Sequence, residues 1–208
     1  MTSANPSEGK SVTVANLAVA VAQTDKEVLL IDADMRKPVQ HKCFRLSNKV
    51  GLSDVITGDK PLDKALNRNV TGSLDVLTSG TIPPNPSELL ASRQMKELLE
   101  TLKERYDMIL IDCAPINVVS DVAGLSQEIA GVVMVVHYGS TTYPELDDAV
   151  NRLALANCNV LGFAVNEVSS KHGSGYYSNY KYKYKYKYDY QYGSAKQAEE
   201  KEKAGFAC

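Results

Sequence analysis

The sequence Ala4-Asn5-Pro6-Ser7-Glu8-Gly9-Lys10-Ser11, followed by the alanine- and valine-rich stretch 14–22, decides the fold of this chain. It matches the phosphate-loop pattern G-x-x-x-x-G-K-[ST] at every fixed position except the first, where Ala4 replaces glycine. In this pattern a loop leads into a helix and offers backbone N–H groups and a positive dipole end to phosphate oxygens. The apolar residues of 14–22 predict a buried helix that begins where the pattern requires one.

The residues of this loop fit distinct chemical tasks. Gly9 lets the backbone approach a phosphate, Lys10 reaches the outer phosphates, and Ser11 can ligate magnesium. The loop residues expected to bind the nucleotide are Ser7, Glu8, Gly9, Lys10, Ser11 and Val12. The triplet Gly-Lys-Ser is a weak signal by itself, since an ordinary loop before a core helix can contain it, so the assignment depends on other motifs.

Outward from the loop, apolar runs of strand length alternate with helical patterns, which is typical of a parallel sheet covered on both faces. The expected strands are 28–31, 74–77, 108–111, 132–136 and 160–165, and the expected helices are 11–23, 87–105 and 144–156. These elements predict an α/β, three-layer P-loop NTPase fold with a mostly parallel sheet. Only Met1, Thr2 and Ser3 precede the phosphate loop, so we expect the first strand to be missing and the domain to be N-terminally truncated.

Two further motifs place carboxylates at the carboxyl ends of buried strands, where ligands bind in open α/β sheets. Asp32 and Asp34 follow the strand 28–31 and lie two residues apart, so they face the same side. Asp112 follows the strand 108–111 in the same way. Such an aspartate can hold Mg²⁺ directly or through water, or it can cap the next helix or turn. Three of them behind a phosphate loop favour the metal site.

Composition sets limits on the class of protein. The chain has 208 residues, of which 44% are hydrophobic, enough for one domain with a sizeable core. Its formal net charge of −2 gives no general attraction to nucleic acid or to an anionic membrane. No apolar run approaches the roughly 20 residues needed to span a bilayer. The cysteines form no CxxC pair, so we expect a reduced, cytoplasmic compartment.

The composition changes abruptly near Ser169, which divides the chain into a domain at 1–168 and a tail at 169–208 that we expect to be disordered. The tail contains the tyrosines Tyr176, Tyr177, Tyr180, Tyr182, Tyr184, Tyr186, Tyr188, Tyr190 and Tyr192. No packed core needs such a cluster. By itself it is compatible with phosphorylation, with a sticky edge strand, or with an aromatic and basic segment for single-stranded nucleic acid.

The order of these motifs resembles that of the bacterial tyrosine kinases of capsule and exopolysaccharide synthesis, the CpsD/CapB type. The resemblance extends over nearly the whole chain: the phosphate loop, the acidic motif at 29–36, the segment Ile109-Leu110-Ile111-Asp112-Cys113-Ala114-Pro115, the segment 79–90 and the tyrosine cluster. It implies a protein-tyrosine autokinase that uses ATP and Mg²⁺ to phosphorylate its own C-terminal tyrosines, in trans between subunits.

The resemblance also implies a role for each site residue. Lys10 would neutralise the transferring phosphate, Ser11 and Asp32 would organise Mg²⁺, and Asp112 would support the metal shell. Asp32 or Asp34 would help to activate the incoming tyrosine hydroxyl. The residues with implied catalytic roles are Lys10, Asp32, Asp34, Asp112 and Arg36, the last adding charge stabilisation. Asn166 resembles a position that contacts the adenine ring, although a turn residue ending a strand is the alternative.

The partners implied by the resemblance are other copies of the chain in a ring and a transmembrane activator that regulates polysaccharide chain length, with no nucleic acid. The location implied is cytoplasmic, at the inner face of the plasma membrane through that partner. The Glu-x-x-Arg-x-x-Arg assembly motif of the family is not found in this sequence. Two alternatives stay open: an ATPase switch of the MinD/ParA type, whose signature lysine is replaced here by Asn5, and a catalytically silent interaction module.

Overall fold

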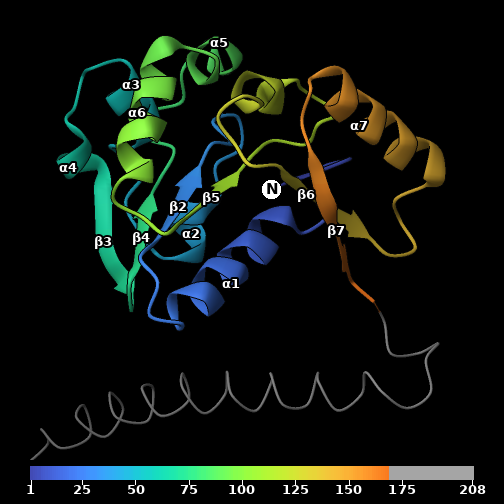
Figure 1. Ribbon diagram of the computed structural model, residues 1–208, viewed down its shortest axis with the longest axis horizontal. Coiled ribbons are helices and arrows are strands. Elements are labelled where there is room, and N and C mark those ends of the chain that lie inside the picture. Colours follow the sequence, from blue (N-terminus) through green and yellow to red (C-terminus); the bar gives the residue numbers. More distant parts are fainter. Residues whose placement is uncertain (169–208) are drawn as a thin grey trace, which may run out of the picture. The chain divides into compact units, whose positions relative to one another are not determined.

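The computed structural model describes residues 1–168, whose strands form two hydrogen-bonded groups (Figure 1). The first group contains, in spatial order, β3 (Leu66–Thr71), β4 (Leu74–Leu77), β2 (Val28–Asp32) and β5 (Met108–Asp112). The second contains β1 (Thr2–Ser3), β6 (Val132–His137) and β7 (Val160–Asn166). Every strand pair is parallel except β3 with β4. The prediction of a mostly parallel sheet, with strands at these positions, is confirmed.

The strand β1 joins the two groups. Thr2 and Ser3 pair with Met134 and Val135 of β6, while the amino group of Met1 donates to the carbonyl of Ile111 in β5. The expectation that the strand before the phosphate loop is missing is therefore wrong, since Thr2 and Ser3 form a strand that pairs with β6. Two residues are too few to show any hydrophobic periodicity, and only their position between β5 and β6 identifies them as a strand.

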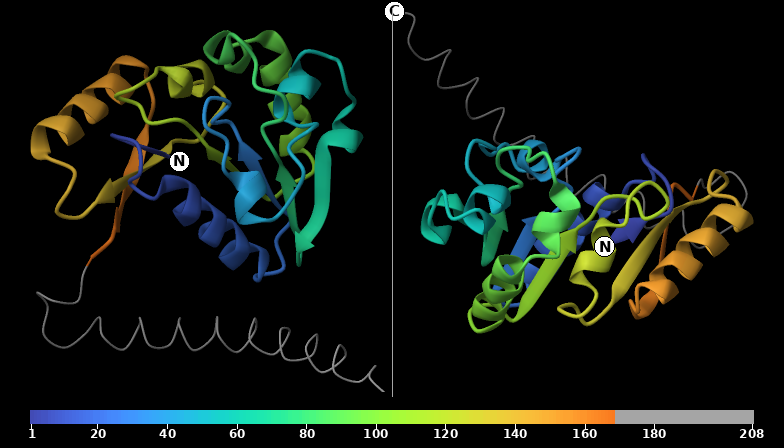
Figure 2. Two further views of the ribbon diagram at one scale, coloured as in Figure 1. Left: turned by 180° about the vertical axis from the view of Figure 1, so that it is seen from behind. Right: turned by 90° about the horizontal axis from the view of Figure 1, so that it is seen from above.

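Helices cover both faces of the sheet (Figures 1 and 2). The longer ones are α1 (Lys10–Ala22), α6 (Arg93–Lys103) and α7 (Tyr143–Leu155). The shorter ones are α2 (Gln40–Cys43), α3 (Leu52–Ile56), α4 (Leu62–Ala65), α5 (Pro86–Leu90) and the 3-10 helix η1 (Asp121–Leu125). No helix within residues 1–168 is both long enough and apolar enough to cross a membrane.

The side chains of β2 show why the fold has three layers. Successive residues of a strand point to opposite faces. Val28 and Leu30 accordingly join a core cluster with the buried residues of α1, whereas Leu29 and Ile31 join a second cluster with residues of α6, η1 and α7. All four side chains are completely buried. The continuous apolar run of β2 thus binds helices on both sides, which confirms the three-layer prediction.

The helix predicted at 87–105 is two helices, α5 and α6. Ser92 interrupts it with an extended backbone, and its hydroxyl accepts a hydrogen bond from the N–H of Met95 at 3.2 Å. This is an N-cap, which favours a new helix start over continuation. Gly124 of η1 packs so closely against Ala91 that an added Cβ would lie 3.1 Å from its backbone nitrogen. Tertiary packing therefore fixes the break.

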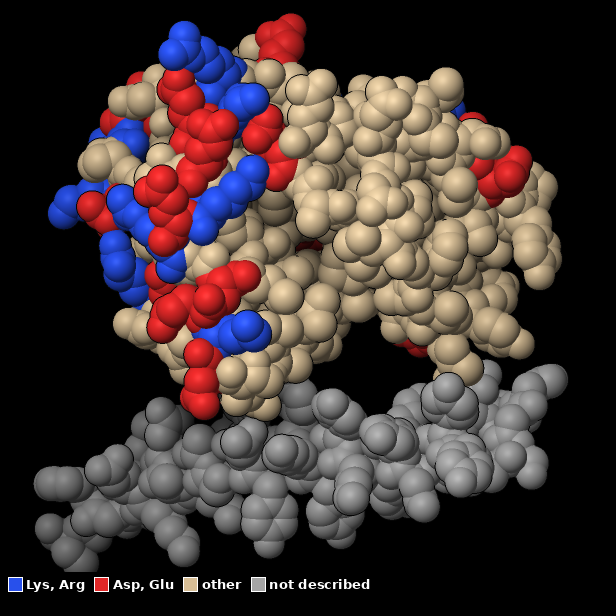
Figure 3. All heavy atoms as spheres, viewed as in Figure 1, with Lys and Arg blue, Asp and Glu red and all other residues tan. Residues whose placement is uncertain are grey.

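The charged side chains in the view of Figure 3 gather on the side formed by α3, α4, β3 and α6. Blue and red groups alternate there, and the opposite side of the same view carries few charges. Some of these charges pair across elements, since Lys96 and Lys103 of α6 both contact Glu128, at 3.2 and 3.6 Å. This face is therefore a mixed, solvated surface.

We expect Leu30→Ala to lower the free energy of unfolding by about 2–5 kcal/mol, because the substitution opens a cavity between β2 and α1. Leu155→Ala is the matched control, since Leu155 is 85% exposed whereas Leu30 is 0% exposed, and it should cost less than about 0.5 kcal/mol. Urea unfolding followed by circular dichroism measures both. Equal effects of the two substitutions would contradict this description of the core.

Candidate active site

The phosphate loop connects β1 to α1 at the carboxyl edge of the sheet. Ser7 and Gly9 both have left-handed backbone conformations, with φ of 65° and 87°, which fold the loop tightly before the helix. Gly9 is the N-cap of α1, and no side chain caps this helix start. The first N–H groups of a helix have no acceptor within the helix. This end of α1 therefore keeps its donors and its positive dipole available for an anion.

Two glycine positions of the pattern have different physical requirements here. Gly9 has a φ of 87°, which strains any other residue, and a Cβ there would also force Nδ2 of Asn166, 2.0 Å away, to shift. Ala4, where the pattern has its first glycine, is completely buried and does not have a positive φ. Its methyl group is therefore tolerated, and the departure from the pattern leaves the loop geometry intact.

Glu8 supports the loop from within. Its buried carboxylate accepts hydrogen bonds from the N–H of Asn5 at 3.1 Å and from Oγ1 of Thr141 at 2.6 Å. Nδ2 of Asn166 donates to the Glu8 carbonyl at 3.2 Å. The segment between β6 and α7 and the end of β7 therefore hold the loop in shape. Thr141 was not predicted, because its contact with Glu8 joins residues far apart in sequence.

Lys10 lies at the centre of the site. Its ammonium group donates to Oδ2 of Asp34 at 2.9 Å, to Oδ1 of Asp112 at 3.1 Å and to Oγ of Ser11 at 3.1 Å. All four residues are buried. Burial by itself would lower the pKa of Lys10, but the carboxylates of Asp112 and Asp34 outweigh it and raise that pKa above its ordinary value. The lysine is therefore a permanent cation.

Asp32 is the one strand-end aspartate with an oxygen that has no partner among the described residues. Its Oδ2 accepts the N–H groups of Val39 and Gln40 at 3.0 and 2.9 Å, whereas its Oδ1 is buried without a partner. Burial, and secondly the charge of Asp112, raise the pKa of Asp32 to about 7, against the opposing effect of the two backbone N–H groups. Such a carboxylate gains stability from any added cation.

Gln40 belongs to this site and was not predicted. It is completely buried, and its Nε2 donates to Oδ2 of Asp112 at 2.7 Å and to the carbonyl of Ser11 at 3.0 Å. An isolated glutamine at the start of a four-residue helix gives no motif in the sequence. Only the folding of α2 back over α1 brings it to Asp112.

The donor set fits a magnesium ion that is held partly by phosphates. Asp32 and Asp112 are direct partners in the parallel register of β2 and β5, which places the two carboxylates side by side. Within residues 1–168 no group of three or more histidine, cysteine or acidic side chains is arranged to hold a metal by itself. Mg²⁺ commonly takes one or two carboxylates and completes its shell with water and substrate phosphates. The hydroxyl of Ser11 and the unpaired Asp32 oxygen suit that arrangement.

Arg36 lies at one side of this cluster. Its Nε donates to Oδ2 of the buried Asp121 at 3.1 Å, and its Nη2 donates to Oγ of Ser87 at 2.9 Å. The hydroxyl of Ser87 also donates to Asp121 at 2.6 Å. Arg36 thus connects the acidic motif to α5 and η1, and it makes no hydrogen bond to Lys10, Asp34 or Asp112 among the described residues.

The remaining predicted residues lie at the rim or outside the described part of the chain. Ser7 is exposed at the loop, and Val12 is 56% exposed on the first turn of α1. Asn166 contacts the loop backbone at the end of β7. The predicted phosphoacceptor tyrosines, and with them the predicted tail 169–208, lie outside the described residues.

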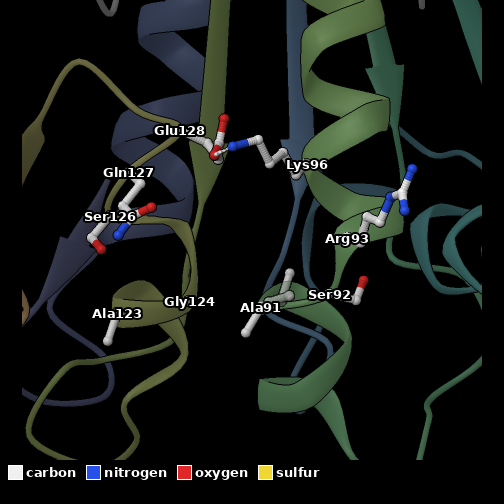
Figure 4. A pocket seen from close by; sticks show the side chains of 10 residues that line it. Ala91, Ser92, Arg93, Lys96, Ala123, Gly124, Ser126, Gln127 and Glu128 are labelled. Carbon is white, nitrogen blue, oxygen red and sulfur yellow. Dashed lines mark ion pairs between the residues drawn. The ribbon is translucent and has the colours of Figure 1, made fainter.

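A surface hollow of about 460 Å³ lies elsewhere, between the α5–α6 turn and η1 (Figure 4). Its lining includes Arg93, Lys96 and Glu128, and the ion pair between Lys96 and Glu128 crosses it. Arg93 pairs with Glu97 at 2.7 Å. None of the predicted site residues lines the hollow, so it is separate from the phosphate loop.

Comparison with known proteins identifies relatives of this chain. Residues 7–141 match a family described as AAA domain. The chain is 46% identical over 179 residues to the tyrosine-protein kinase YwqD of Bacillus subtilis, covering 85% of this chain and 76% of that protein. It is 37% identical over 176 residues to the tyrosine-protein kinase etk of Escherichia coli, covering 85% of this chain but 24% of that protein.

Solved structures show the same relationship. The kinase domain of Escherichia coli ETK has a TM-score of 0.79 and 36% identity, covering 84% of this chain and 69% of that one. The septum site-determining protein MinD of Pyrococcus horikoshii, complexed with Mg-ADP, has a TM-score of 0.67 and 23% identity, covering 82% and 70%. The second likeness shows the P-loop fold alone.

The raised pKa of Asp32 predicts how stability changes with pH. Between about pH 4 and pH 7 the folded chain binds a proton at Asp32 that the unfolded chain has lost, so the free energy of unfolding falls as pH rises. Asparagine cannot ionise. With EDTA present, Asp32→Asn should therefore gain stability relative to the unmodified chain across this window, by up to about 4 kcal/mol above pH 7.

Urea unfolding of both chains at pH 5, 6, 7 and 8 measures this gain. Asp148→Asn is the control, because Asp148 is an exposed residue of α7 whose side chain, within residues 1–168, pairs with Arg152 alone. Its effect should be small at every pH. A stability difference for Asp32→Asn that does not change with pH would contradict the assignment.

Proposed function

Because this chain belongs to the bacterial tyrosine-protein kinases, we propose that its site transfers the γ-phosphoryl group of ATP, with Mg²⁺, to the tyrosines at 176–192. The observation that carries the proposal is the buried ammonium of Lys10, held between Asp34 and Asp112 at the uncapped start of α1. Phosphoryl transfer needs mainly positioning and electrostatic stabilisation. A fixed cation beside two carboxylates at a helix N-terminus supports both.

In this proposal Lys10 exchanges partners during the reaction. Its three hydrogen bonds go to Ser11, Asp34 and Asp112. Binding the phosphates would draw the ammonium away from one or both carboxylates, because a phosphate with more than one negative charge competes with them. The first N–H groups of α1 would hold the same phosphates from the other side. Lys10 and the helix start thereby neutralise charge on the transferring group.

The metal residues in this proposal are Ser11, Asp32 and Asp112. A bound magnesium ion supplies charge neutralisation on the phosphates and fixes their geometry. Asp32 offers the unpaired Oδ1, and the cation would keep this carboxyl ionised at neutral pH. Asp112 has both oxygens engaged, by Lys10 and Gln40, which suits a supporting role in the outer shell.

Asp34 is the residue that we assign to the tyrosine hydroxyl. In this proposal Asp32 holds the metal, whereas Oδ2 of Asp34 has Lys10 as its one partner in the described part of the chain and would become free when Lys10 turns to a phosphate. Its other oxygen accepts the N–H of Lys37 at 3.0 Å, which fixes the carboxylate. Asp34 would then accept the hydroxyl proton as the phenolic oxygen attacks phosphorus. Arg36 would stabilise the incoming chain from its place beside Asp121.

We also propose the wider arrangement implied by the family resemblance. Chains phosphorylate one another in a ring, and each new phosphate adds about −1.5 to −2 charges to the tail. The acidic site would repel such a tail and so release it. A transmembrane activator would bring the ring to the inner face of the plasma membrane, where modification of the tail regulates capsular or exopolysaccharide synthesis.

Labelled ATP tests the reaction. With Mg²⁺ the chain should form phosphotyrosine, and replacing the nine tyrosines at 176–192 by phenylalanine should abolish the label while leaving ATP binding intact. Tyr143→Phe is the control, since Tyr143 is 89% exposed but lies outside the cluster. Phosphotyrosine that persists in the nine-fold variant would contradict the tail assignment. Release of free phosphate alone would favour the MinD/ParA-type switch, and neither product would favour a silent module.

A mixing experiment tests transfer between chains. Lys10→Met should lose at least about a hundredfold in activity, because one charge-stabilising group is removed from the transition state. When this variant, with its tyrosines intact, is mixed with the active chain that carries the nine phenylalanines, the Lys10→Met chain should become labelled. Phosphotyrosine mass spectrometry of the two chains measures this. No label on either chain in the mixture would show that transfer occurs only within a chain.

A further inference from the structure

Gln40 contacts three parts of the proposed metal site at once. Its Nε2 donates to Oδ2 of Asp112 and to the carbonyl of Ser11, at 2.7 and 3.0 Å. Its backbone N–H donates to Oδ2 of Asp32 at 2.9 Å. The side chain is completely buried. These bonds connect the start of α1 to the strand-end aspartates of β2 and β5 through one residue.

The amide fixes the orientation of Asp112. One carboxylate oxygen binds Lys10 and the other binds Gln40, so rotation of the carboxylate would break a buried hydrogen bond. Such a break costs the desolvation energy of the group left unpaired. Asp32 is constrained in a similar way, since two consecutive backbone N–H groups hold its Oδ2 and leave its Oδ1 unpaired.

The amide is also the chemically suitable group for this place. Glutamic acid would add a fourth carboxylate to Asp32, Asp34 and Asp112, and lysine would compete with Lys10 for the same oxygens. A neutral donor avoids both. The other polar atom of the amide, Oε1 of Gln40, is buried and has no partner among the described residues. The same is true of Oδ1 of Asp32. Two unpaired acceptors, on residues that are linked by the hydrogen bond from the Gln40 N–H to Asp32, suit a hydrated cation, whose water ligands are hydrogen-bond donors.

We propose that Gln40 is a positioning residue of the magnesium site: its side-chain amide holds Asp112 in the orientation that the hydrated ion requires, while its backbone N–H helps to hold Asp32. The inference rests on the proposed function, since it concerns the same metal. Residues in the outer shell of a metal site commonly change metal affinity by about 10–100-fold when they are replaced. Gln40 should therefore affect the magnesium requirement far more than the affinity for nucleotide alone.

The test uses Gln40→Met, which has a similar volume but no amide, in the full chain. A fluorescent ADP analogue is titrated first with EDTA and then with increasing Mg²⁺. Gln40→Met should bind the analogue as the unmodified chain does in EDTA, but should need about tenfold more Mg²⁺ for the metal-dependent increase in affinity. Gln94→Met is the matched control, because Gln94 is exposed on α6, and it should leave both measurements unchanged.

Gln40→Glu keeps the length of the side chain and is the second variant if Gln40→Met unfolds. It should alter the magnesium requirement as well, because its carboxyl group cannot donate to Asp112 when ionised. Unchanged magnesium dependence in a folded variant would overturn the positioning role. An equal loss of affinity for the ADP analogue with and without Mg²⁺ would overturn it too, because such a loss indicates a purely structural role. If the unmodified chain itself shows no magnesium-dependent binding of the analogue, the proposed function is wrong, whatever the Gln40 variants do.

Discussion

The buried contact of Lys10 with two carboxylates is the constraint on which the rest of the site depends. Charges that are removed from water must be paired, because an isolated buried ion costs several kcal/mol. Lys10 lies between Asp34 and Asp112 at 2.9 and 3.1 Å, and all three side chains are buried. The positions of α1, β2 and β5 relative to one another are therefore fixed by electrostatics as well as by packing.

The charges of this cluster do not cancel, because it contains more carboxyl groups than cations. Asp34 and Asp112 both contact Lys10, whereas Asp32 beside them has no cation partner among the described residues. Burial, and secondly the charge of Asp112, raise the pKa of Asp32 to about 7. A kinase site that binds a magnesium ion and phosphates brings both a cation and an anion to this place. The excess of carboxylates thus suits the metal ion, and the uncapped start of α1 beside it suits the phosphates.

The loop itself is held in shape by hydrogen bonds from residues within it and around it. Glu8 accepts hydrogen bonds from Asn5 within the loop and from Thr141 outside it, and a Cβ added at Gly9 would lie 2.0 Å from Nδ2 of Asn166. Arg36 similarly ties the acidic motif to Asp121 and Ser87. Rigid support of this kind matters because a site based on electrostatics works only when its dipoles and charges are already oriented.

The sequence by itself determined the class of fold and most of the charged residues of the site. The apolar runs of β2, β5, β6 and β7 are long enough to be recognised, and motifs such as Gly9-Lys10-Ser11 combine several chemical requirements in adjacent residues. Local patterns of this kind are visible because strands and helix starts impose a short period on the chain. The tyrosine cluster was equally plain, although its use is still a proposal.

Only the tertiary structure decided which side chains meet. Gln40, Thr141 and Asp121 carry no local signal, and each acts through a partner that is far away in the chain: Asp112, Glu8 and Arg36. The two-residue strand β1 and the break at Ser92 also depend on neighbours in space. The physical reason is that hydrogen bonding and desolvation are set by three-dimensional proximity, whereas sequence patterns report the period of individual elements.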